Sequence, residues 1–481
     1  MSKSIKANFV YNLICQLIVL VVPLITIPYL SRILLEDGIG AYSYAEAMVT
    51  YFTMFALLGS SVYAQREVGS KRGNIEETSR VFFEMLIFRT ITMGVALFVY
   101  FFYVYMSGVD ITLSLIVGLQ IINCAVDISW FYQGNEEFKI TAIVSTLYRV
   151  LSAVCIFTLV KSKDQVWVYA LINSLTIFLT SLTYWLFLRK RIIRVSGIKP
   201  FSHLKGVFAL FLPTIATQIY MVLDKSMIGW FTVGDAENGY YEYAEKIIRI
   251  CMTLIMSLST ILLSRNASAF AENDIEAVKT NVYKGISYGF MVTFPICLGL
   301  IAVADIFVPV YFGGDFIKTA LLLKLFSPLI IFMGFQNVIG MTLLLPIKKQ
   351  NVYVISVIVS AIVNIILNFI LVPKFLSIGA VVATIIAEFL CVSVQLFYVF
   401  KKGYLSIIEF FRRSVKYFIS AIIMFLGTWG VGFLVTGISI IALLSKLAVG
   451  VIFYFLTLLL LKDEFFIGLL KQAFSLIKAK K

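Results

Sequence analysis

Long apolar stretches separated by short polar breaks run along the whole chain. A window of about 20 residues, the length that a helix needs to cross a bilayer, finds fourteen of them. They centre roughly on residues 8–30, 41–64, 81–106, 112–133, 141–160, 166–188, 208–232, 240–264, 283–304, 320–344, 353–373, 378–400, 415–436 and 439–461. Their apolar residues are continuous, not alternating as in a β-barrel strand, and lipid offers no water to unpaired backbone groups. The pattern therefore predicts an all-α polytopic membrane protein with about fourteen transmembrane helices.

Composition agrees with this interpretation. Of 481 residues, 60% are hydrophobic and only 14% are charged, whereas soluble domains are about 45–50% apolar. Lys3 and Lys6 precede the first apolar stretch as they would in a signal peptide. That stretch is longer than the roughly 7–15 apolar residues of a signal peptide, so we expect it to remain as an uncleaved first helix.

Basic residues are distributed unevenly between the two sides of the predicted spans. Most of the 40 Lys and Arg residues fall in connections on the same side as the N-terminus. The connections on the other side contain only Arg32, Lys161, Lys163, Lys318 and Lys374. Because basic connections stay inside, both termini are predicted to be cytoplasmic. The net charge of +14 then faces anionic lipid headgroups, and nucleic acid is not an expected partner.

Motifs for catalysis or metal binding do not stand out. All six cysteines fall inside predicted spans without a CxxC pair, and His203 is the only histidine. No P-loop, GxSxG or HExxH motif is present. The sequence predicts no enzyme, no metal site and no cofactor, apart from coupling to H⁺ or Na⁺.

A short motif occurs twice, 199 residues apart. IGAYSYAEAM at 39–48 returns as NGYYEYAEKI at 238–247, so Gly40 and Glu46 correspond to Gly239 and Glu245. Six spans separate the two copies, and an even number means that both enter the membrane in the same direction. The repeat therefore predicts two parallel bundles related by an axis along the membrane normal. The domains expected are a six-helix bundle at 1–188, a cytoplasmic linker at 189–207, a second six-helix bundle at 208–400, and two further helices with a basic tail at 401–481.

Four segments carry a resemblance to a known family. They are PYLSRILLEDGIGAYSYAEA (28–47), WFYQGNEEFK (130–139), LDKSMIG (223–229) and NGYYEYAEKIIRI (238–250). With the layout of six, six and two spans, they resemble the polysaccharide-transport branch of the multidrug/oligosaccharidyl-lipid/polysaccharide (MOP) exporter superfamily. Within that branch they are most similar to Wzx-type flippases.

The resemblance implies a fold and a function. The fold is a MATE/MurJ-like V of two bundles that open alternately to either side of the membrane. The function is translocation of undecaprenyl-pyrophosphate-linked oligosaccharide repeat units from the cytoplasmic to the outer leaflet, for capsule, O-antigen or other surface polysaccharide. It further implies the inner or plasma membrane of a bacterium, and as partners the lipid-linked oligosaccharide, membrane lipids, and a polysaccharide polymerase with other assembly proteins.

Charges inside predicted spans are the candidate functional residues. A charge at the bilayer centre is costly, so those that remain usually face a wet cavity or the inside of a bundle. Guanidinium and ammonium groups are suited to bind a diphosphate, and the candidates for substrate binding are Arg32, Arg149, Lys225, Lys246 and Arg249. The candidate counterions or coupling acids are Glu46, Asp127, Asp224 and Glu245, and the uncharged polar residues expected to line the cavity are Asn12, Gln16, Asn123 and Gln218.

The same residues also fit a purely structural role. Asp224 is next to Lys225, and Glu245 lies four residues before Arg249, so these charges could neutralise each other within the bundle. Glu84, Arg89 and Lys324 lie nearer span ends or lack a polar stripe, and we expect them to extend to the interface. Tyr42, Tyr44, Tyr241 and Tyr243 could stack on sugar rings or pack between helices. Pro23, Pro28 and Pro213 are expected bend points.

Three other functions remain open. A lipid II flippase also moves an undecaprenyl pyrophosphate and is barely separable by sequence. A multidrug or cation antiporter of the same superfamily would favour acids and aromatics over the five basic candidates. A membrane-embedded polysaccharide polymerase or ligase would need a sizeable outer loop, whereas the longest outer connections, near 232–240 and 305–319, are short.

Overall fold

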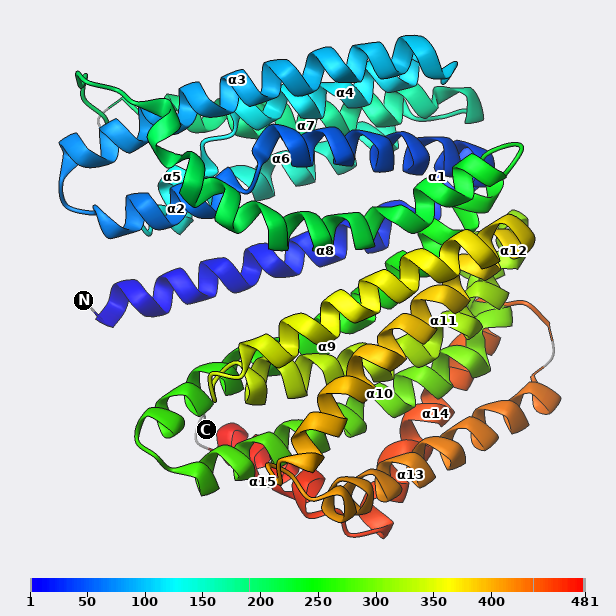
Figure 1. Cartoon of the computed structure of the whole chain (residues 1–481). Coiled ribbons are helices and arrows are strands. Elements are labelled where there is room, and N and C mark those ends of the chain that lie inside the picture. The colour runs from blue at the N-terminus through cyan, green and yellow to red at the C-terminus, as the bar shows by residue number, and fades with distance from the viewer. Residues whose placement is uncertain (1, 190, 436, 479–481) are drawn as a thin grey trace. The chain divides into compact units, whose positions relative to one another are not determined.

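The computed structural model of the chain is built from helices (Figure 1). It describes residues 2–189, 191–435 and 437–478, with the side chains at 2–20, 210, 212–221, 254–255, 257–258, 260–261, 264, 434, 472–474 and 476–478 excepted. No strand occurs among these residues. The predicted all-α class is confirmed.

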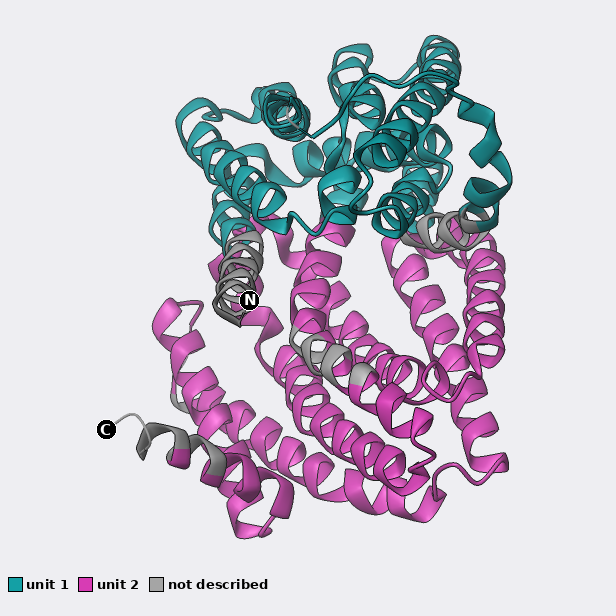
Figure 2. Ribbon diagram, turned by 90° about the vertical axis from the view of Figure 1, so that its left-hand side faces the viewer, with its two compact units in different colours: residues 1–239 teal, residues 240–481 magenta. Residues whose placement is uncertain are grey.

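Packing divides the chain into two compact units, Met1–Gly239 and Tyr240–Lys481 (Figure 2). The predicted linker at 189–207 lies within the first unit and not at its boundary. A division by packing does not decide which helices belong to which repeat, so the domain boundaries inferred from the sequence stay a prediction.

The first unit contains eight complete α-helices among the residues described. They are α1 (Ser2–Leu57), α2 (Ser60–Ser70), α3 (Ile75–Ser107), α4 (Ile111–Val126), α5 (Ser129–Gly134), α6 (Phe138–Leu159), α7 (Val166–Leu186) and α8 (Leu204–Phe231). α1 packs against α3, α4, α6 and α8, and α4 packs against α7. An aromatic cluster that includes Phe82, Trp130, Phe131, Tyr132 and Tyr184 fills the core beside α2 and α5.

Helix α1 contains the predicted span 8–30 and most of the predicted span 41–64, without a loop between them. Its only non-helical residue is Leu35, at φ 56° and ψ −177°. The helix continues through Pro23 and Pro28, so the break lies at Leu35 and not at either proline. Pro213 belongs to a stretch whose side chains lie outside the described residues. The backbone conformation of Leu35 is nearly restricted to glycine, and a leucine in it stores about 1–3 kcal/mol of strain.

The predicted span at 112–133 is also interrupted. α4 ends at Val126 and α5 begins at Ser129, so Asp127 and Ile128 leave the helical path in the middle of an apolar stretch. Such a break frees backbone groups that the surrounding protein must satisfy, because no water is available in lipid.

The second unit contains three long helices, α9, α10 and α12, and three shorter helices at its C-terminal end. Its elements are α9 (Ala236–Ala271), which begins at the end of the first unit, α10 (Ile275–Tyr311), α11 (Ile317–Gln336), a π-helix (Asn337–Leu344), α12 (Gln350–Lys401), α13 (Ile407–Leu434), α14 (Ile440–Leu460) and α15 (Glu464–Lys478). α10 packs on α11 and α13, and Phe290, Phe335 and Phe410 lie in the buried core between them. α12 again joins two predicted spans, through the non-helical Leu376.

Ten helical segments in the described part are long and apolar enough to cross a membrane. Large apolar side chains point outward from them, including Phe98 at 75% exposure and Tyr105 at 85% on α3. Lipid, and not water, is the solvent that suits such a surface. A multi-pass membrane protein is therefore confirmed, whereas the count of fourteen spans stays a prediction.

Candidate functional site

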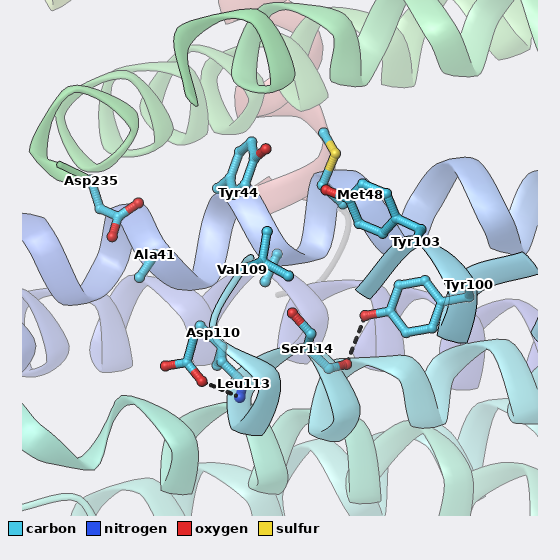
Figure 3. Close-up of a pocket in the computed structure, with 11 residues that line it drawn as sticks. Ala41, Tyr44, Met48, Tyr100, Tyr103, Val109, Asp110, Leu113, Ser114 and Asp235 are labelled. Carbon is cyan, nitrogen blue, oxygen red and sulfur yellow. Dashed lines mark hydrogen bonds between the residues drawn. The ribbon is translucent and has the colours of Figure 1, made fainter. Parts of the chain in front are cut away.

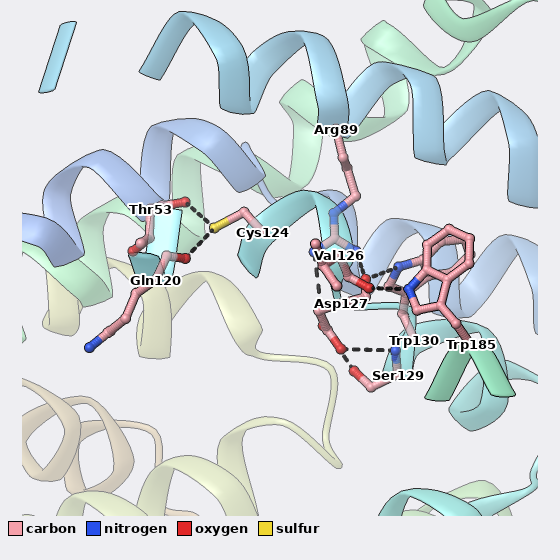
Figure 4. A network of polar contacts seen from close by, with 9 residues as sticks. All are labelled: Thr53, Arg89, Gln120, Cys124, Val126, Asp127, Ser129, Trp130 and Trp185. Carbon is pink, nitrogen blue, oxygen red and sulfur yellow. Dashed lines mark hydrogen bonds and ion pairs between the residues drawn. The ribbon is translucent and has the colours of Figure 1, made fainter. Parts of the chain in front are cut away.

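The break between α4 and α5 is held by a buried polar network (Figure 4). Arg89 of α3 donates from Nη1 to the carbonyl oxygen of Asp127 at 2.9 Å, and its Nη2 lies 3.9 Å from the Asp127 carboxylate. Trp130 donates to the same carbonyl at 3.0 Å, and Trp185 donates to the carbonyl of Val126 at 2.8 Å. Two of the carbonyls at the break, those of Val126 and Asp127, are thus hydrogen-bonded by side chains.

The Asp127 carboxylate also accepts hydrogen bonds from Ser129, the first residue of α5. The backbone N–H and the hydroxyl of Ser129 donate to its two oxygens, each at 3.0 Å. About a quarter of the Asp127 side chain is exposed, whereas Arg89 is 1% exposed. From the sequence we expected Arg89 to extend to the interface. It is buried instead, because the broken helix next to it supplies a carbonyl and a carboxylate to bind.

Asn123 and Gln120 lie one and two turns before this break. The Asn123 Oδ1 and Gln120 Nε2 atoms are buried, and neither has a hydrogen-bond partner within the described residues. Figure 4 shows the Gln120 amide turned away from the Arg89 network. A buried amide without a partner costs roughly 1–3 kcal/mol. Such groups mark a place where water or a ligand would be bound favourably.

Arg149 is a half-buried cation on α6. No hydrogen bond or ion pair connects its side chain to another described residue. Arg149 therefore differs from Lys246 and Arg249, the candidates that lie against a carboxylate. This is the arrangement expected of a group that binds an external anion.

The remaining candidates of the first unit lie on α1 and α8. Glu46 is half-buried and accepts a hydrogen bond from Tyr42 at 3.1 Å. Arg32 is exposed near the end predicted to face outside, and its Nη1 donates to the Pro28 carbonyl at 3.4 Å. On α8, Asp224 is buried and Lys225 half-buried.

On α9 the predicted charges form two ion pairs, each spanning one helical turn. Lys246 Nζ lies 2.6 Å from Glu242 Oε1, and Arg249 Nε donates to Glu245 Oε1 at 3.0 Å. Glu242 is buried, while nearly half of the Arg249 side chain is exposed. The structure thus contains the mutual neutralisation that the spacing allowed. Any anion reaching Lys246 or Arg249 must compete with a carboxylate.

Three of the predicted polar residues cannot be placed in the same way. Asn12, Gln16 and Gln218 lie outside the residues whose side chains are described. Their expected location in a cavity stays a prediction.

One buried polar cluster was missed from the sequence. His203 Nε2 and Glu84 Oε2 are 2.6 Å apart, His203 Nδ1 and the Tyr63 hydroxyl are 3.0 Å apart, and the Lys199 N–H donates to Glu84 Oε1 at 2.9 Å. Glu84 was expected at the interface, but it is buried and fixes the segment before α8 to α3. Since these partners lie more than 100 residues apart, no local pattern could have shown the contact.

A second missed cluster lies within α12, on both sides of Leu376. Asn368 donates to Asn364 Oδ1 at 3.1 Å, and Asn364 donates to Thr384 at 3.2 Å. Both asparagines are fully buried. The spacing of four residues between them was visible in the sequence, but the fold-back of α12 that brings Thr384 beside them was not.

The two copies of the sequence repeat meet at their glycines, inside the first unit. A Cβ atom on Gly40 would lie 1.7 Å from the Asp235 carbonyl oxygen, and one on Gly239 would lie 2.1 Å from that of Glu36. Asp235 corresponds to Glu36 at the repeat offset, so the contact is reciprocal, as in an interface with two-fold symmetry. We call this contact the glycine crossing. It lies beside the ends of the predicted spans 41–64 and 240–264 that are expected to face outside.

Two family models match this sequence. The model of the polysaccharide biosynthesis protein family matches residues 5–263, and that of the lipid II flippase MurJ family matches residues 138–461. The first covers more than half of the chain. The chain belongs to the polysaccharide biosynthesis protein family. This confirms the resemblance to the polysaccharide-transport branch of the MOP superfamily.

Two relatives of the chain carry the name of a transporter. The chain is 22% identical over 408 residues to a protein of Escherichia coli strain K12 described as an O-antigen transporter, an alignment that covers 82% of this chain and 97% of the relative. It is 21% identical over 381 residues to a Shigella dysenteriae protein with the same description, covering 77% and 93%. Both names agree with the prediction that the chain is not an enzyme.

Solved structures confirm the fold expected for this family. Lipid II flippase MurJ in an inward closed conformation matches with a TM-score of 0.78 at 18% identity, over 95% of this chain and 99% of that one. An inward-facing multidrug resistance transporter of the MATE family matches with a TM-score of 0.57 at 16% identity, over 80% and 99%. The chain therefore has a MurJ/MATE-like fold.

Proposed function

We propose that the protein is a flippase for undecaprenyl-pyrophosphate-linked oligosaccharide repeat units. It moves them from the cytoplasmic to the outer leaflet of a bacterial inner or plasma membrane, for O-antigen, capsule or another surface polysaccharide. Family membership and the O-antigen transporters among its relatives support this class of cargo. The observation that carries the proposal is Arg149, a half-buried guanidinium in an apolar helix without a neutralising partner among the described residues.

Arg149 binds the diphosphate of the cargo. A guanidinium offers two parallel N–H donors to phosphate oxygens, and its strength grows where water is excluded. Lys225 adds a point charge from α8. Lys246 and Arg249 are held by Glu242 and Glu245, so they contribute only when the diphosphate displaces those carboxylates. Arg32, at the predicted outer end, is the last cation along the path.

Asp127, Glu46, Asp224 and Glu245 serve as counterions or as sites for a coupling H⁺ or Na⁺. Asp127 is the strongest of these candidates in the described structure. It lies at a broken helix, where oriented backbone groups and a carboxylate converge, and broken helices carry ion sites in many transporters. Asn123 and Gln120, with their unpaired amide atoms one and two turns away, supply further polar contacts.

Alternating access supplies the movement. The domains inferred from the repeat rock about the cytoplasmic linker at 189–207, with both termini in the cytoplasm, and the polymerase that extends the glycan receives the cargo outside. The glycine crossing closes the outer side while cargo enters from the inside. Because two helices touch there through bare backbone, a small rotation is enough to separate them.

A lipid II flippase is the second candidate. It is favoured by the match of the MurJ family model over residues 138–461 and by the fold. The two cargoes share the diphosphate and the polyprenyl chain, so they differ only in the contacts that the sugars make.

The test is a flipping assay in proteoliposomes with two cargoes, a pyrophosphate-linked oligosaccharide repeat unit and lipid II. Wild-type protein is expected to move the oligosaccharide faster. Arg149→Ala should slow flipping about ten- to a hundredfold, since a hydrogen bond to a charged group contributes about 1.5–3 kcal/mol, and Arg149→Lys should keep part of the rate. Arg66→Ala is the matched control, because Arg66 is two-thirds exposed. Unchanged flipping by Arg149→Ala would contradict this site, and preferential flipping of lipid II would select the second candidate.

A further inference from the structure

A small cavity lies inside the first unit, beside the glycine crossing (Figure 3). Its volume is about 160 Å³. It lies between α1, the turn that joins α3 to α4, and the connection between α8 and α9. Sites for drug-sized ligands are typically about 300–1,000 Å³, so this cavity is sized for a single small ring.

Three tyrosines and two carboxylates define its chemistry. Tyr44 comes from α1, Tyr100 and Tyr103 from the last turns of α3, Asp110 from the start of α4, and Asp235 from the connection before α9. Figure 3 shows the Tyr44 and Tyr103 side chains on the same side of the cavity, with Asp110 and Asp235 toward its other end. Aromatic faces and charged acceptors are thus presented to one small volume.

The lining groups are held in place by their neighbours. The rings of Tyr100 and Tyr103 pack on Phe52 at centroid distances of 4.9 and 5.6 Å. The Tyr100 hydroxyl donates to the Ser114 carbonyl at 2.7 Å, and Asp110 Oδ1 accepts from the Leu113 N–H at 3.0 Å. A fixed aromatic wall loses little entropy when a ligand binds.

The chemistry of this lining selects the class of ligand. The C–H face of a sugar ring can lie on an aromatic ring, while its hydroxyl groups donate hydrogen bonds to carboxylate oxygens, which act only as acceptors. A sugar ring therefore uses both kinds of group in this cavity. Burial, with the negative charges of Asp37 and Asp110, raises the pKa of Asp235, and hydroxyl donors would stabilise its ionised form.

We propose that the cavity is a binding site for one sugar ring, entered from the outer side, and that its occupation stabilises the closed glycine crossing. The proposal rests on the proposed function for the outward orientation and for a glycan on that side. Asp235 is one of the residues that line the cavity, and its backbone carbonyl oxygen packs against Gly40 at the glycine crossing. Opening the crossing removes Asp235 from the cavity, so the complete site exists only in the closed state, and a ligand that binds one state shifts the equilibrium toward it.

The first experiment measures binding directly. The full-length protein in lipid nanodiscs is mixed with glucose, rhamnose or N-acetylglucosamine, and with tetramethylammonium as a cation probe, and saturation-transfer NMR records which probe is bound. We expect transfer to at least one sugar, and a dissociation constant at least tenfold weaker in Tyr103→Ala and Asp110→Asn. Asparagine keeps the cap at the start of α4, so Asp110→Asn tests the charge and not the helix. Tyr105→Ala is the matched control, because Tyr105 is two residues away on α3 and points outward.

Three outcomes of this measurement overturn the proposal. They are transfer to tetramethylammonium without any sugar, no transfer to any probe, and sugar binding that Tyr103→Ala and Asp110→Asn leave unchanged. Tyr103→Ala and Asp110→Asn change different helices, so misfolding of one variant still leaves the other to decide.

The second experiment measures whether sugar binding in the cavity keeps the glycine crossing closed. Asn238→Cys, in a background without other cysteines, places a thiol at a buried position in the first turn of α9. Saturating sugar should slow its reaction with a water-soluble maleimide at least threefold, and the Asp110→Asn variant should lose this protection. An unchanged or faster reaction contradicts the link. Sugar binding without glycolipid flipping would count against the proposed function alone, and flipping without sugar binding would count against this site alone.

Discussion

Gly40 and Gly239, which correspond to each other in the sequence repeat, lie directly against each other's helix. A Cβ atom on Gly40 would lie 2.9 Å from the backbone nitrogen of Gly239 and 1.7 Å from the Asp235 carbonyl oxygen. Real Cβ atoms do not approach backbone so closely, so both positions require the absence of a side chain. The repeat therefore preserves a contact as well as a sequence.

Gly40→Ala should force the crossing apart. The obstructing atoms are backbone, which cannot rotate away, and overpacking of this kind costs about 1–3 kcal/mol. We expect the Asn238→Cys thiol to react faster with a water-soluble maleimide in this variant. Gly94→Ala is the matched control, since a Cβ there meets no atom within 4 Å. Equal reaction rates in Gly40→Ala and in the unsubstituted background would mean that the crossing is not closed in the membrane.

The crossing should also respond to pH through Asp235, which lies in the connection between α8 and α9. Burial, followed by the charges of Asp37 and Asp110, raises its pKa. The folded state therefore holds a proton that the unfolded state releases between the ordinary Asp pKa near 3.9 and the raised pKa of Asp235. Stability falls as the pH rises through that window, because the folded protein binds more protons there. Thermal unfolding measured from pH 4 to 8 should show this decline, and Asp235→Asn should flatten it. A decline of the same size in Asp235→Asn would assign the effect to another group.

Asp127→Asn should destabilise the protein more than Arg89→Met. Arg89 is almost completely buried, and Asp127 is the carboxylate beside it. Removing that charge strands a buried cation, at about 3–5 kcal/mol, whereas replacing Arg89 by an apolar side chain loses about 1.5–3 kcal/mol of hydrogen bonding. The double variant should unfold near the temperature of Arg89→Met in detergent. If Asp127→Asn abolishes flipping without lowering the unfolding temperature, Asp127 is a coupling site and not a counterion of Arg89.

The Glu245–Arg249 pair on α9 can be tested by removing one or both of its charges. Arg249→Ala leaves Glu245 without the cation that lies at its Oε1, and we expect reduced flipping. The double change Glu245→Gln with Arg249→Gln removes both charges and leaves the helix neutral. Near-normal flipping by the double variant would show that Arg249 only neutralises Glu245. Loss of flipping in the double variant, with normal protein in the membrane, would assign Arg249 to the cargo.

Topology can be mapped with two single cysteines in a cysteine-free background. Ser196 lies in the basic segment predicted to be cytoplasmic, and Val233 is fully exposed at the predicted outer end. An impermeant thiol reagent added to intact cells should label Val233→Cys and leave Ser196→Cys unlabelled until the membrane is opened. Labelling of both from outside would contradict the orientation inferred from Lys and Arg.

The helices could be predicted because their cause is local. Continuous apolar stretches of membrane length leave the chain no other way to satisfy its backbone, so the class followed from hydropathy. The irregular points could not be predicted in this way. Nothing in the neighbours of Leu35 or Leu376 signals a left-handed leucine, and the break at Asp127 depends on Arg89, which is 38 residues earlier in the chain.

The candidate charges could be named, but their partners could be only partly inferred. The Glu245–Arg249 pair on α9 spans four residues of one helix, so spacing alone suggested it, whereas the Glu242–Lys246 pair was not proposed. Arg89 and Glu84 were placed wrongly because the groups that retain them belong to other helices and to the segment before α8. Local spacing reports contacts within a helix, whereas contacts between helices depend on how the helices pack.

Leu35 and Leu376 each join two predicted spans through one residue. An inserted residue there would turn one span by about 100° relative to the other and move its lipid-facing side chains into the protein. Evolution can therefore vary the length of this chain at 196–197 or 233–234, where exposed connections absorb a change, but not at these two leucines. An alignment of relatives should show no insertions or deletions beside Leu35 and Leu376, even where the amino acids themselves have diverged.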